Sequence, residues 1–287
     1  MSEKLTRVEF TNLDKILYPE LKITKGQVIE YYIKIAPKML DLIADRPLVL
    51  TRYPNGVQAE GFFEKDAPLG TPSWVKTFRS YSKTAERELN YVVCDNLDTL
   101  IWLANLAALE IHMTLSKTSA FENPDLVVFD LDPKSPAGYD DVVEVANLLK
   151  EKLDALSLKS YVKTSGKKGF HLLIPIGEGY TFEDARRFVQ KIGEYLKKQT
   201  DKVVTERSKS ETPGKIYVDY VQNSHGRTMI CPYSLRATPQ ATVSTPLAWS
   251  KIKKGLNPET LNLLNVVNIA DNPWQGLLEE KQKLGDV

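Results

Sequence analysis

The chain has few of the residues that build disulfide frameworks or zinc sites. Its 287 residues include two cysteines and three histidines, and Cys94 and Cys231 lie far apart in apolar surroundings. Closely spaced cysteines are what mark a disulfide-rich domain or a zinc site. The sequence therefore indicates two reduced core cysteines and excludes both of those classes.

Long apolar runs are lacking as well. No stretch approaches the roughly 20 apolar residues of a membrane-spanning helix, and the polar start Met1-Ser2-Glu3-Lys4 does not resemble a secretory signal. Hydrophobic residues still make up 42% of the chain and charged residues 26%, as is usual for a globular protein. We expect a cytoplasmic protein without a membrane partner.

The chain has almost no net charge, +1 at pH 7, but its charges are unevenly distributed. Residues 120–157 carry nine acidic and three basic side chains, whereas residues 159–215 carry thirteen basic and seven acidic ones. An acidic segment followed by a basic one suits a polyanionic substrate that is held through cations. Uneven surface charge is also common, so this distribution gains weight only beside specific motifs.

Hydrophobic spacing and turn residues predict a mixture of helices and strands. Thr24 is a candidate N-cap for a helix over 24–43, in which apolar residues recur at helical spacing. Further helices are predicted over 97–112, 140–156, 182–199 and 256–267, and strands over 46–53, 61–65, 91–94, 160–164, 170–176 and 215–220. Because these elements do not alternate as βαβ units, the pattern predicts an α+β fold. Trp274 is expected to anchor the C-terminal segment.

The most informative stretch is Leu126-Val-Val-Phe-Asp130-Leu-Asp132-Pro133. In a strand, side chains alternate between the two faces, so Asp130 and Asp132 point the same way. Two carboxylates on one face repel each other unless a cation lies between them, and Mg²⁺ and Mn²⁺ prefer oxygen ligands. The alternative is a strand that simply ends in an Asp-Pro turn.

A second motif is the glycine-rich turn in Lys163-Thr-Ser165-Gly-Lys-Lys168-Gly-Phe-His171, between two predicted strands. Glycines let the backbone expose N–H groups, and Ser165 and the lysines add donors and charge, which favours a phosphate-binding turn. The spacing differs from that of a Walker A loop. A solvated hairpin and a structural His171 are the alternatives.

Two more polar residues complete the pattern. Asp219, near the end of the strand predicted over 215–220, could join the first two carboxylates, and three carboxylates suffice to hold two metal ions. Arg236, in a proline-containing segment, could bind phosphate in a bidentate manner. The alternatives are an aspartate on a polar strand face and a surface arginine.

These motifs occur in the order found in the archaeo-eukaryotic primase superfamily. They are Asp130-Leu-Asp132-Pro, Ser165-Gly-x-x-Gly-x-His171, Val218-Asp219-Tyr220 and Pro232-Tyr-Ser-Leu-Arg236-Ala. More closely, the chain resembles the polymerase domain of bacterial ligase D and its standalone archaeal and bacterial relatives, the primase-polymerases of non-homologous end joining. The resemblance extends from the segment that begins at Phe10 to Trp249.

The resemblance implies one primase-polymerase domain over 1–287, with an N-terminal lobe over about 1–118 and a catalytic lobe over about 119–287. It implies an α+β, two-lobed fold with mixed or antiparallel sheets flanked by helices.

It also implies roles for individual residues. The catalytic and metal-binding residues are Asp130, Asp132 and Asp219; the nucleotide-binding residues are Arg52, Phe63, His112, Ser165, Lys168, His171 and Arg236; and the residues for a DNA 5′-phosphate are Asn12, Lys15 and Lys25. Because neighbours on a strand alternate, one of Phe62 and Phe63 is expected to face the core, and we expect Phe63 to be exposed.

The implied function is template-dependent addition of nucleotides, preferentially ribonucleotides, at gaps and broken DNA ends. The implied cofactors are two divalent ions, Mn²⁺ or Mg²⁺. The implied partners are gapped or broken DNA, NTP or dNTP, Ku and a separate DNA ligase, in a cytoplasmic, nucleoid-associated protein. The alternatives are a primase that starts strands de novo and a non-catalytic scaffold that binds DNA ends. Ser210-Glu-Thr-Pro213 departs from the family, which often has a basic residue there.

Overall fold

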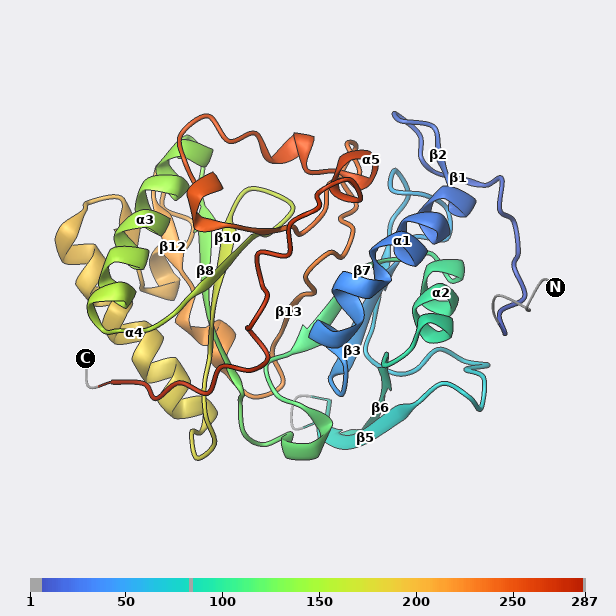
Figure 1. Ribbon diagram of the computed structural model, residues 1–287, viewed down its shortest axis with the longest axis horizontal. Helices are drawn as coiled ribbons and strands as arrows, with labels where there is room; N and C mark the ends of the chain where they lie inside the picture. The colour runs from blue at the N-terminus through green and yellow to red at the C-terminus, as the bar shows by residue number, and fades with distance from the viewer. Residues whose placement is uncertain (1–6, 83–84, 286–287) are drawn as a thin grey trace. The chain divides into compact units, whose positions relative to one another are not determined.

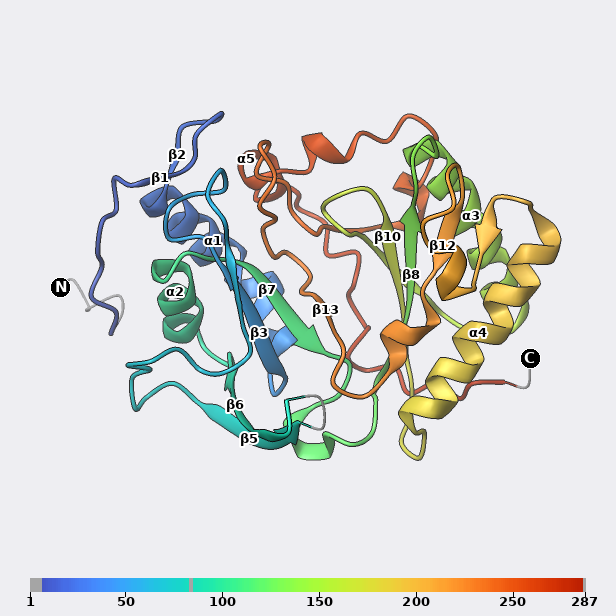
Figure 2. The ribbon, with the colours of Figure 1, turned by 180° about the vertical axis from the view of Figure 1, so that it is seen from behind.

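The computed structural model describes residues 7–82 and 85–285, which cluster into two compact units (Figures 1 and 2). The first unit comprises the chain up to Thr114 together with Ile230–Ser244 and Glu259–Ala270. The second comprises Leu115–Met229, Thr245–Pro258 and the chain from Asp271 onward. The first unit thus includes two late segments that the predicted boundary near residue 118 assigns to the catalytic lobe.

The first unit is built on an antiparallel sheet with a pair of helices. The strand order is β13–β7–β3–β6–β5, and β4 pairs with β3. The bounds are β3 Pro47–Arg52, β4 Phe62–Glu64, β5 Thr77–Ser82, β6 Arg87–Val93, β7 Ala108–Thr114 and β13 Thr228–Ile230, of which only Ile230 falls within this unit. β1 (Ile16–Tyr18) and β2 (Ile23–Thr24) form a separate two-stranded sheet. α1 (Lys25–Ile43) packs on α2 (Leu97–Asn105).

The start of α1 confirms the predicted N-cap. The Thr24 hydroxyl accepts a hydrogen bond from the backbone N–H of Gln27, and the Gln27 side chain accepts one from the backbone N–H of Thr24. This capping box satisfies two N–H groups that the first helical turn leaves without partners. The apolar face predicted for the helix is buried, including Val28, Ile35 and Met39.

The helix predicted over 97–112 is wrong in its second half. α2 ends at Asn105, the chain turns at Ala107, whose φ is 55°, and β7 follows. β7 is buried on both faces except at His112. Its residues therefore form a continuous apolar run, and periodicity alone does not distinguish such a strand from a buried helix.

The second unit has a mixed sheet with two helices on one face. The strand order is β11–β12–β8–β10–β9–β14, in which only the pair β11–β12 is parallel among the described pairings. The bounds are β8 Leu126–Pro133, β9 Tyr161–Thr164, β10 Phe170–Pro175, β11 Val203–Val204, β12 Ile216–Val218 and β14 Pro246–Leu247, with α3 Tyr139–Ala155 and α4 Phe182–Gln199.

Ring contacts identify the face that the helices cover. Phe129 of β8 packs edge-on against Phe188 of α4, at 6.2 Å between ring centroids, and Phe170 of β10 packs on Tyr139 of α3 at 4.9 Å. Because side chains alternate along a strand, Asp130 and His171 project from the opposite face. One face of the sheet is thus buried under α3 and α4, and the polar residues Asp130 and His171 lie on the other face.

Short elements complete the chain. The 3₁₀ helices are η1 Thr118–Ala120, η2 Arg207–Lys209, η3 Tyr220–Asn223, η4 Trp249–Lys251 and η5 Pro258–Thr260. The helix predicted over 256–267 is reduced to η5 and the four-residue α5 (Leu263–Val266). The predicted anchor is confirmed, since Trp274 is buried and its Nε1–H donates to the carbonyl of Val162 at 3.0 Å. Within residues 7–82 and 85–285, no helix is long and apolar enough to cross a membrane.

Candidate functional site

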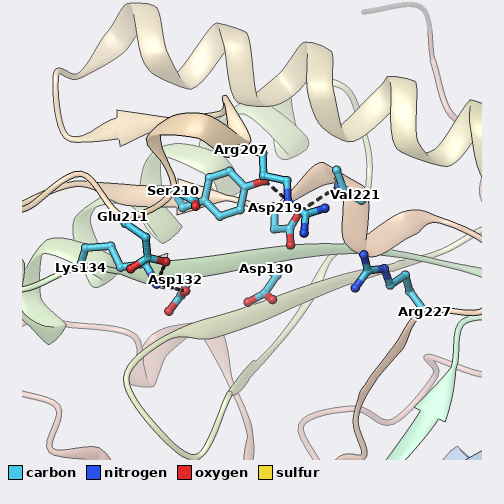
Figure 3. A pocket seen from close by; sticks show the side chains of 10 residues that line it. Asp130, Asp132, Lys134, Arg207, Ser210, Glu211, Asp219, Val221 and Arg227 are labelled. Atoms are coloured by element: carbon cyan, nitrogen blue, oxygen red, sulfur yellow. Dashed lines mark hydrogen bonds and ion pairs between the residues drawn. The ribbon is translucent and has the colours of Figure 1, made fainter.

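Three carboxylates line one pocket of about 220 Å³ in the second unit (Figure 3). Asp130 and Asp132 lie on β8, on the face that the helices leave uncovered, as strand alternation predicts. Asp219 follows β12, the neighbour of β8, and its backbone N–H donates to the carbonyl of Asp130 at 3.1 Å. Antiparallel pairing of the two strands is therefore what brings the third carboxylate to the first two.

Asp219 lies in an environment that opposes its negative charge. Burial raises the pKa of its carboxyl group, and the nearby charge of Asp130 raises that pKa further. Two donors act in the other direction: the Tyr217 hydroxyl lies 3.2 Å and the Val221 backbone N–H 3.0 Å from Oδ1 of Asp219 (Figure 3). A cation bound between Asp130 and Asp219 would relieve their repulsion.

Asp132 already has a cationic neighbour. The Lys134 ammonium lies 2.9 Å from Oδ2 of Asp132 and 3.0 Å from Oε1 of Glu211, and the hydrogen bond to Asp132 raises the pKa of Lys134. Glu211 belongs to the stretch in which the sequence departs from the family. It is mostly exposed and places a fourth carboxylate on the pocket wall.

The donor set of this pocket fits a divalent cation. Carboxylate oxygens are the ligands that Mg²⁺ and Mn²⁺ prefer, and Asp130, Asp132 and Asp219 supply them from adjoining strands. Nevertheless, no three His, Cys, Asp or Glu side chains in the described part of the chain are already close enough together to hold a metal ion. The three carboxylates share a pocket without converging on one point.

Two arginines in the pocket were missed by the sequence analysis. Arg207 and Arg227 line it and extend toward Asp219 (Figure 3). Both are exposed, and the positive charge of Arg227 acts to lower the pKa of the Asp219 carboxyl group. Arg207 lies just upstream of the atypical stretch and Arg227 just after the third carboxylate, so proximity along the chain to Asp219 was the available signal.

His171 lies beside the first carboxylate. Its Nε2 is 3.3 Å from Oδ1 of Asp130, and its Nδ1 is 2.8 Å from Nζ of Lys163, a fully buried lysine. The role predicted for His171, nucleotide binding, stays a prediction. Lys163 was quoted within the motif but not assigned a role. The available signal was the position of Lys163 across the glycine-rich turn from His171. In the antiparallel pair β9–β10 these two residues lie directly opposite each other.

The glycine-rich turn connects β9 and β10 next to these residues. The Ser165 hydroxyl accepts hydrogen bonds from the backbone N–H groups of Lys167 (3.2 Å) and Gly169 (3.1 Å), so it orders the turn. A Cβ at Gly169 would lie 2.1 Å from the carbonyl oxygen of Leu131, so this position requires glycine. Lys168 is exposed and could reach an anion.

In the first unit, a buried glutamate holds two of the predicted nucleotide-binding residues. Oε1 of Glu110 lies 3.0 Å from Nε of Arg236 and also accepts the backbone N–H of Ala237. Its Oε2 lies 3.7 Å from Nε2 of His112. Glu110 and His112 are two residues apart on β7, which places both on one face of that strand. The sequence analysis missed Glu110 because it predicted a helix here. In a strand, alternation places Glu110 on the same face as His112.

The aromatic pair on β4 differs from expectation. Phe63 is exposed as predicted, at 58%, but Phe62 is exposed as well, at 42%. The assumption that one of them faces the core fails because β4 pairs only with β3 among the described strands. The Arg52 guanidinium covers the Phe62 ring at 4.9 Å and pairs with Glu64 at 3.0 Å, while Phe63 lies 6.4 Å from the His112 ring.

The residues predicted to bind a 5′-phosphate lie together at the start of α1. The backbone N–H of Lys15 donates to the carbonyl of Asn12, and that of Lys25 donates to the carbonyl of Lys15. The two ammonium groups donate to neutral oxygens, Lys15 to Asn55 Oδ1 and Lys25 to Thr11 Oγ1, each at 3.0 Å. Burial and the like charge of Lys15 lower the pKa of Lys25.

Comparison with known proteins identifies the family to which the chain belongs. Residues 24–274 match the family model described as LigD, primase-polymerase domain. The bifunctional non-homologous end joining protein LigD of Bacillus subtilis is 37% identical over 264 residues, which cover 91% of this chain and 42% of that protein. The multifunctional non-homologous end joining protein LigD of Mycolicibacterium smegmatis is 36% identical over 256 residues, covering 87% of this chain and 33% of that protein.

A solved structure has the same fold. The polymerase domain from Mycobacterium tuberculosis ligase D, in complex with DNA, superposes with a TM-score of 0.84 at 32% identity, covering 91% of this chain and 93% of that chain. The predicted α+β fold is thereby confirmed. The chain spans less than half the length of the curated relatives that it matches.

Proposed function

The chain belongs to the LigD primase-polymerase domain family, and we propose that it is a template-dependent nucleotidyltransferase that adds nucleotides at gaps and broken DNA ends in non-homologous end joining. The observation that carries the proposal is the pocket lined by Asp130, Asp132 and Asp219. A chain with the same fold was solved in complex with DNA, which supports DNA as the substrate here.

Asp130, Asp132 and Asp219 would hold the divalent ions. Two bound Mn²⁺ or Mg²⁺ ions would supply charge stabilisation for an in-line displacement at phosphorus. In that displacement the primer 3′-hydroxyl attacks the α-phosphorus of the nucleotide and pyrophosphate leaves. Asp130 and Asp132 would hold the ions from β8 and Asp219 from the residue after β12, and Arg207 and Arg227 would offer positive charge to phosphates at the same pocket.

The predicted nucleotide-binding residues keep their proposed roles. Lys168 binds phosphate from a turn ordered by Ser165, and Phe63 offers a ring for base stacking, which tolerates any base. Arg52, His112 and Arg236 are the other proposed nucleotide contacts, together with His171. The glutamates next to Arg52 and Arg236 position those guanidinium groups before a ligand arrives.

Asn12, Lys15 and Lys25 are proposed to bind the 5′-phosphate on the downstream side of a gap. Both ammonium groups donate to neutral oxygens, so no carboxylate competes with an anion at these contacts, and the N-terminus of α1 adds a favourable dipole. Ku and a separate DNA ligase are the proposed partners, NTP and dNTP the substrates, with a preference for ribonucleotides, in the cytoplasm at the nucleoid.

Extension of gapped DNA tests the proposal. The purified chain is given a primer–template with a one-nucleotide gap, with or without a downstream 5′-phosphate, and each NTP or dNTP in Mn²⁺ or Mg²⁺. We expect template-directed addition that is fastest with the 5′-phosphate and with ribonucleotides. Products from a template without a primer would instead favour de novo initiation, and DNA binding without extension would favour a scaffold.

A further inference from the structure

Three polar side chains form a row across three adjacent strands of the second unit. In the antiparallel register, Lys163 of β9 pairs with His171 of β10, and His171 pairs with Asp130 of β8. Residues paired in this way project from the same face of a sheet. The side chains make the corresponding contacts, 2.8 Å from Lys163 Nζ to His171 Nδ1 and 3.3 Å from His171 Nε2 to Asp130 Oδ1.

The inner end of this row is closed to solvent. Lys163 has no exposed surface, and the His171 side chain is 9% exposed, whereas the Asp130 side chain is 27% exposed and opens into the pocket. A buried lysine is costly unless its ammonium group is hydrogen-bonded. The imidazole that receives one of those hydrogen bonds is therefore part of what makes this burial tolerable.

The chemistry of the two partners determines where the histidine carries its proton. A lysine ammonium has three donors and no acceptor. When Lys163 is protonated, Nδ1 of His171 is the acceptor, because a proton on Nδ1 would set two donors against each other at 2.8 Å. A neutral imidazole that accepts at Nδ1 carries its proton on Nε2, and Nε2 is the atom that faces Asp130.

We propose that Lys163 is a positioning residue that fixes His171 as the Nε2–H tautomer, so that His171 donates to Oδ1 of Asp130 and orients this carboxylate in the pocket. The proposal rests on the proposed function where it concerns metal binding at Asp130. An outer partner that orients a ligand in this way changes metal affinity by about 10–100-fold. In this arrangement His171 is the hydrogen-bond donor and Asp130 the acceptor.

The tautomer can be observed without metal or substrate. The chain has three histidines, so long-range ¹H–¹⁵N spectra of the ¹⁵N-labelled protein give three imidazole patterns, assigned with the variants His112→Gln and His225→Gln. We expect a protonated Nε2 and an unprotonated Nδ1 for His171. A protonated Nδ1 in the unaltered protein would overturn the proposal, even if no Lys163 variant folds.

The variant Lys163→Met removes the donor and keeps an unbranched side chain of similar length. We expect the His171 pattern to change toward the other tautomer, and Mn²⁺ affinity, measured by calorimetry, to fall about 10–100-fold. Lys198→Met, at an exposed position on α4, is the matched control and should change neither. An unchanged His171 pattern in Lys163→Met would overturn the assignment.

The two readouts separate this proposal from the proposed function. A changed tautomer with unchanged Mn²⁺ affinity would keep the role of Lys163 toward His171 and overturn its extension to Asp130. If Asp130→Asn also left Mn²⁺ affinity unchanged, the metal site itself would be wrong, and the tautomer result would still stand.

Discussion

The two units hold their charged candidate residues in opposite ways. In the second unit the candidate metal ligands are acids, and two of them have hydrogen-bond donors as neighbours: His171 beside Asp130, and Lys134 beside Asp132. In the first unit the predicted nucleotide-binding residues include two arginines, and the neighbours of these are acids: Glu64 beside Arg52, and Glu110 beside Arg236. Each unit therefore positions a side chain with a partner of opposite charge or with a hydrogen-bond donor.

Lys15 and Lys25 depart from that arrangement. Their ammonium groups donate to neutral oxygens of Asn55 and Thr11, so no carboxylate competes at those contacts with an incoming anion. The comparison suggests a division of roles. A residue held by an acid contributes to stability and orientation, whereas a cation held by neutral oxygens is available to bind a ligand. Substitutions in the two classes should therefore differ in which property they change.

The largest effect is expected at the carboxylates of the pocket. Asp130→Asn or Asp132→Asn should lower the rate of nucleotide addition by more than the ~10–100-fold that loss of an outer-shell partner causes, because a direct ligand is removed. DNA binding should be retained or strengthened, since a negative charge is lost. Gel-based extension and fluorescence anisotropy measure the two properties, with Glu151→Gln on the exposed side of α3 as control. Extension at the unaltered rate would contradict the metal assignment.

The next largest effect is expected at the two lysines of the first unit. Lys15→Ala combined with Lys25→Ala should weaken binding to 5′-phosphorylated gaps by about 1.5–3 kcal/mol for each lost charge-assisted contact. Binding to unphosphorylated gaps should change far less. Anisotropy titrations at several salt concentrations measure this, and the salt dependence should also decrease because fewer counterions are released.

Lys34→Ala, at an exposed position on α1, is the matched control for loss of a lysine from the same unit. It should not reduce the affinity for phosphorylated or for unphosphorylated gaps by a comparable amount. Equal losses on both DNA substrates in the double variant would show that the lysines contact the DNA backbone generally, and that no terminal phosphate is recognised.

A smaller effect that combines stability with function is expected at Glu110. Glu110→Gln should lower the free energy of unfolding by about 1.5–3 kcal/mol, the range for hydrogen bonds to charged groups, because the mostly buried Arg236 loses its anionic partner. The Michaelis constant for the nucleotide should rise as well. Glu64→Gln, whose pair with Arg52 is more exposed, should cost less. Thermal melts and steady-state kinetics measure both, and a larger loss for Glu64→Gln would contradict the comparison.

Much of the second unit could be predicted from the sequence, because its chemistry follows from strand alternation. Asp130 and Asp132 share a face by spacing alone. In the first unit, the Thr24 cap of α1 likewise has a local signature. Pairings between distant strands leave no such signature. For this reason the contacts of Lys163 and the pocket positions of Arg207 and Arg227 emerge only from the fold.

His112 illustrates the other limit of the sequence. Its apolar neighbours predict a helix, and a cation at the end of a helix could simply act as a cap. The structure places His112 within β7, two residues from Glu110, so helix capping is excluded as its role. A short apolar run can form either a buried strand or a buried helix, and periodicity does not distinguish the two. Here the turn at Ala107 ends the helix and lets the strand begin.

The smallest effect, and the most specific, is expected in the pH dependence of 5′-phosphate recognition. Burial and the charge of Lys15 lower the pKa of Lys25, so Lys25 loses its proton at a lower pH than an ordinary lysine. As pH rises through that lowered pKa, the preference for phosphorylated gaps should decline. Stability should change in the opposite direction in the same window: the unfolded chain binds the proton more tightly than the folded one, so stability rises with pH until the ordinary lysine pKa is reached.

The variant Lys25→Arg distinguishes this mechanism from a general alkaline effect on DNA binding. A guanidinium remains charged throughout the accessible range, so the variant should keep its preference for the 5′-phosphate at the alkaline pH where the unaltered protein begins to lose it. Affinities for phosphorylated and unphosphorylated gaps, measured in parallel from neutral to alkaline pH, give the ratio directly. If the ratio falls equally in both proteins, the decline comes from another group, and the lowered pKa of Lys25 has no part in recognition.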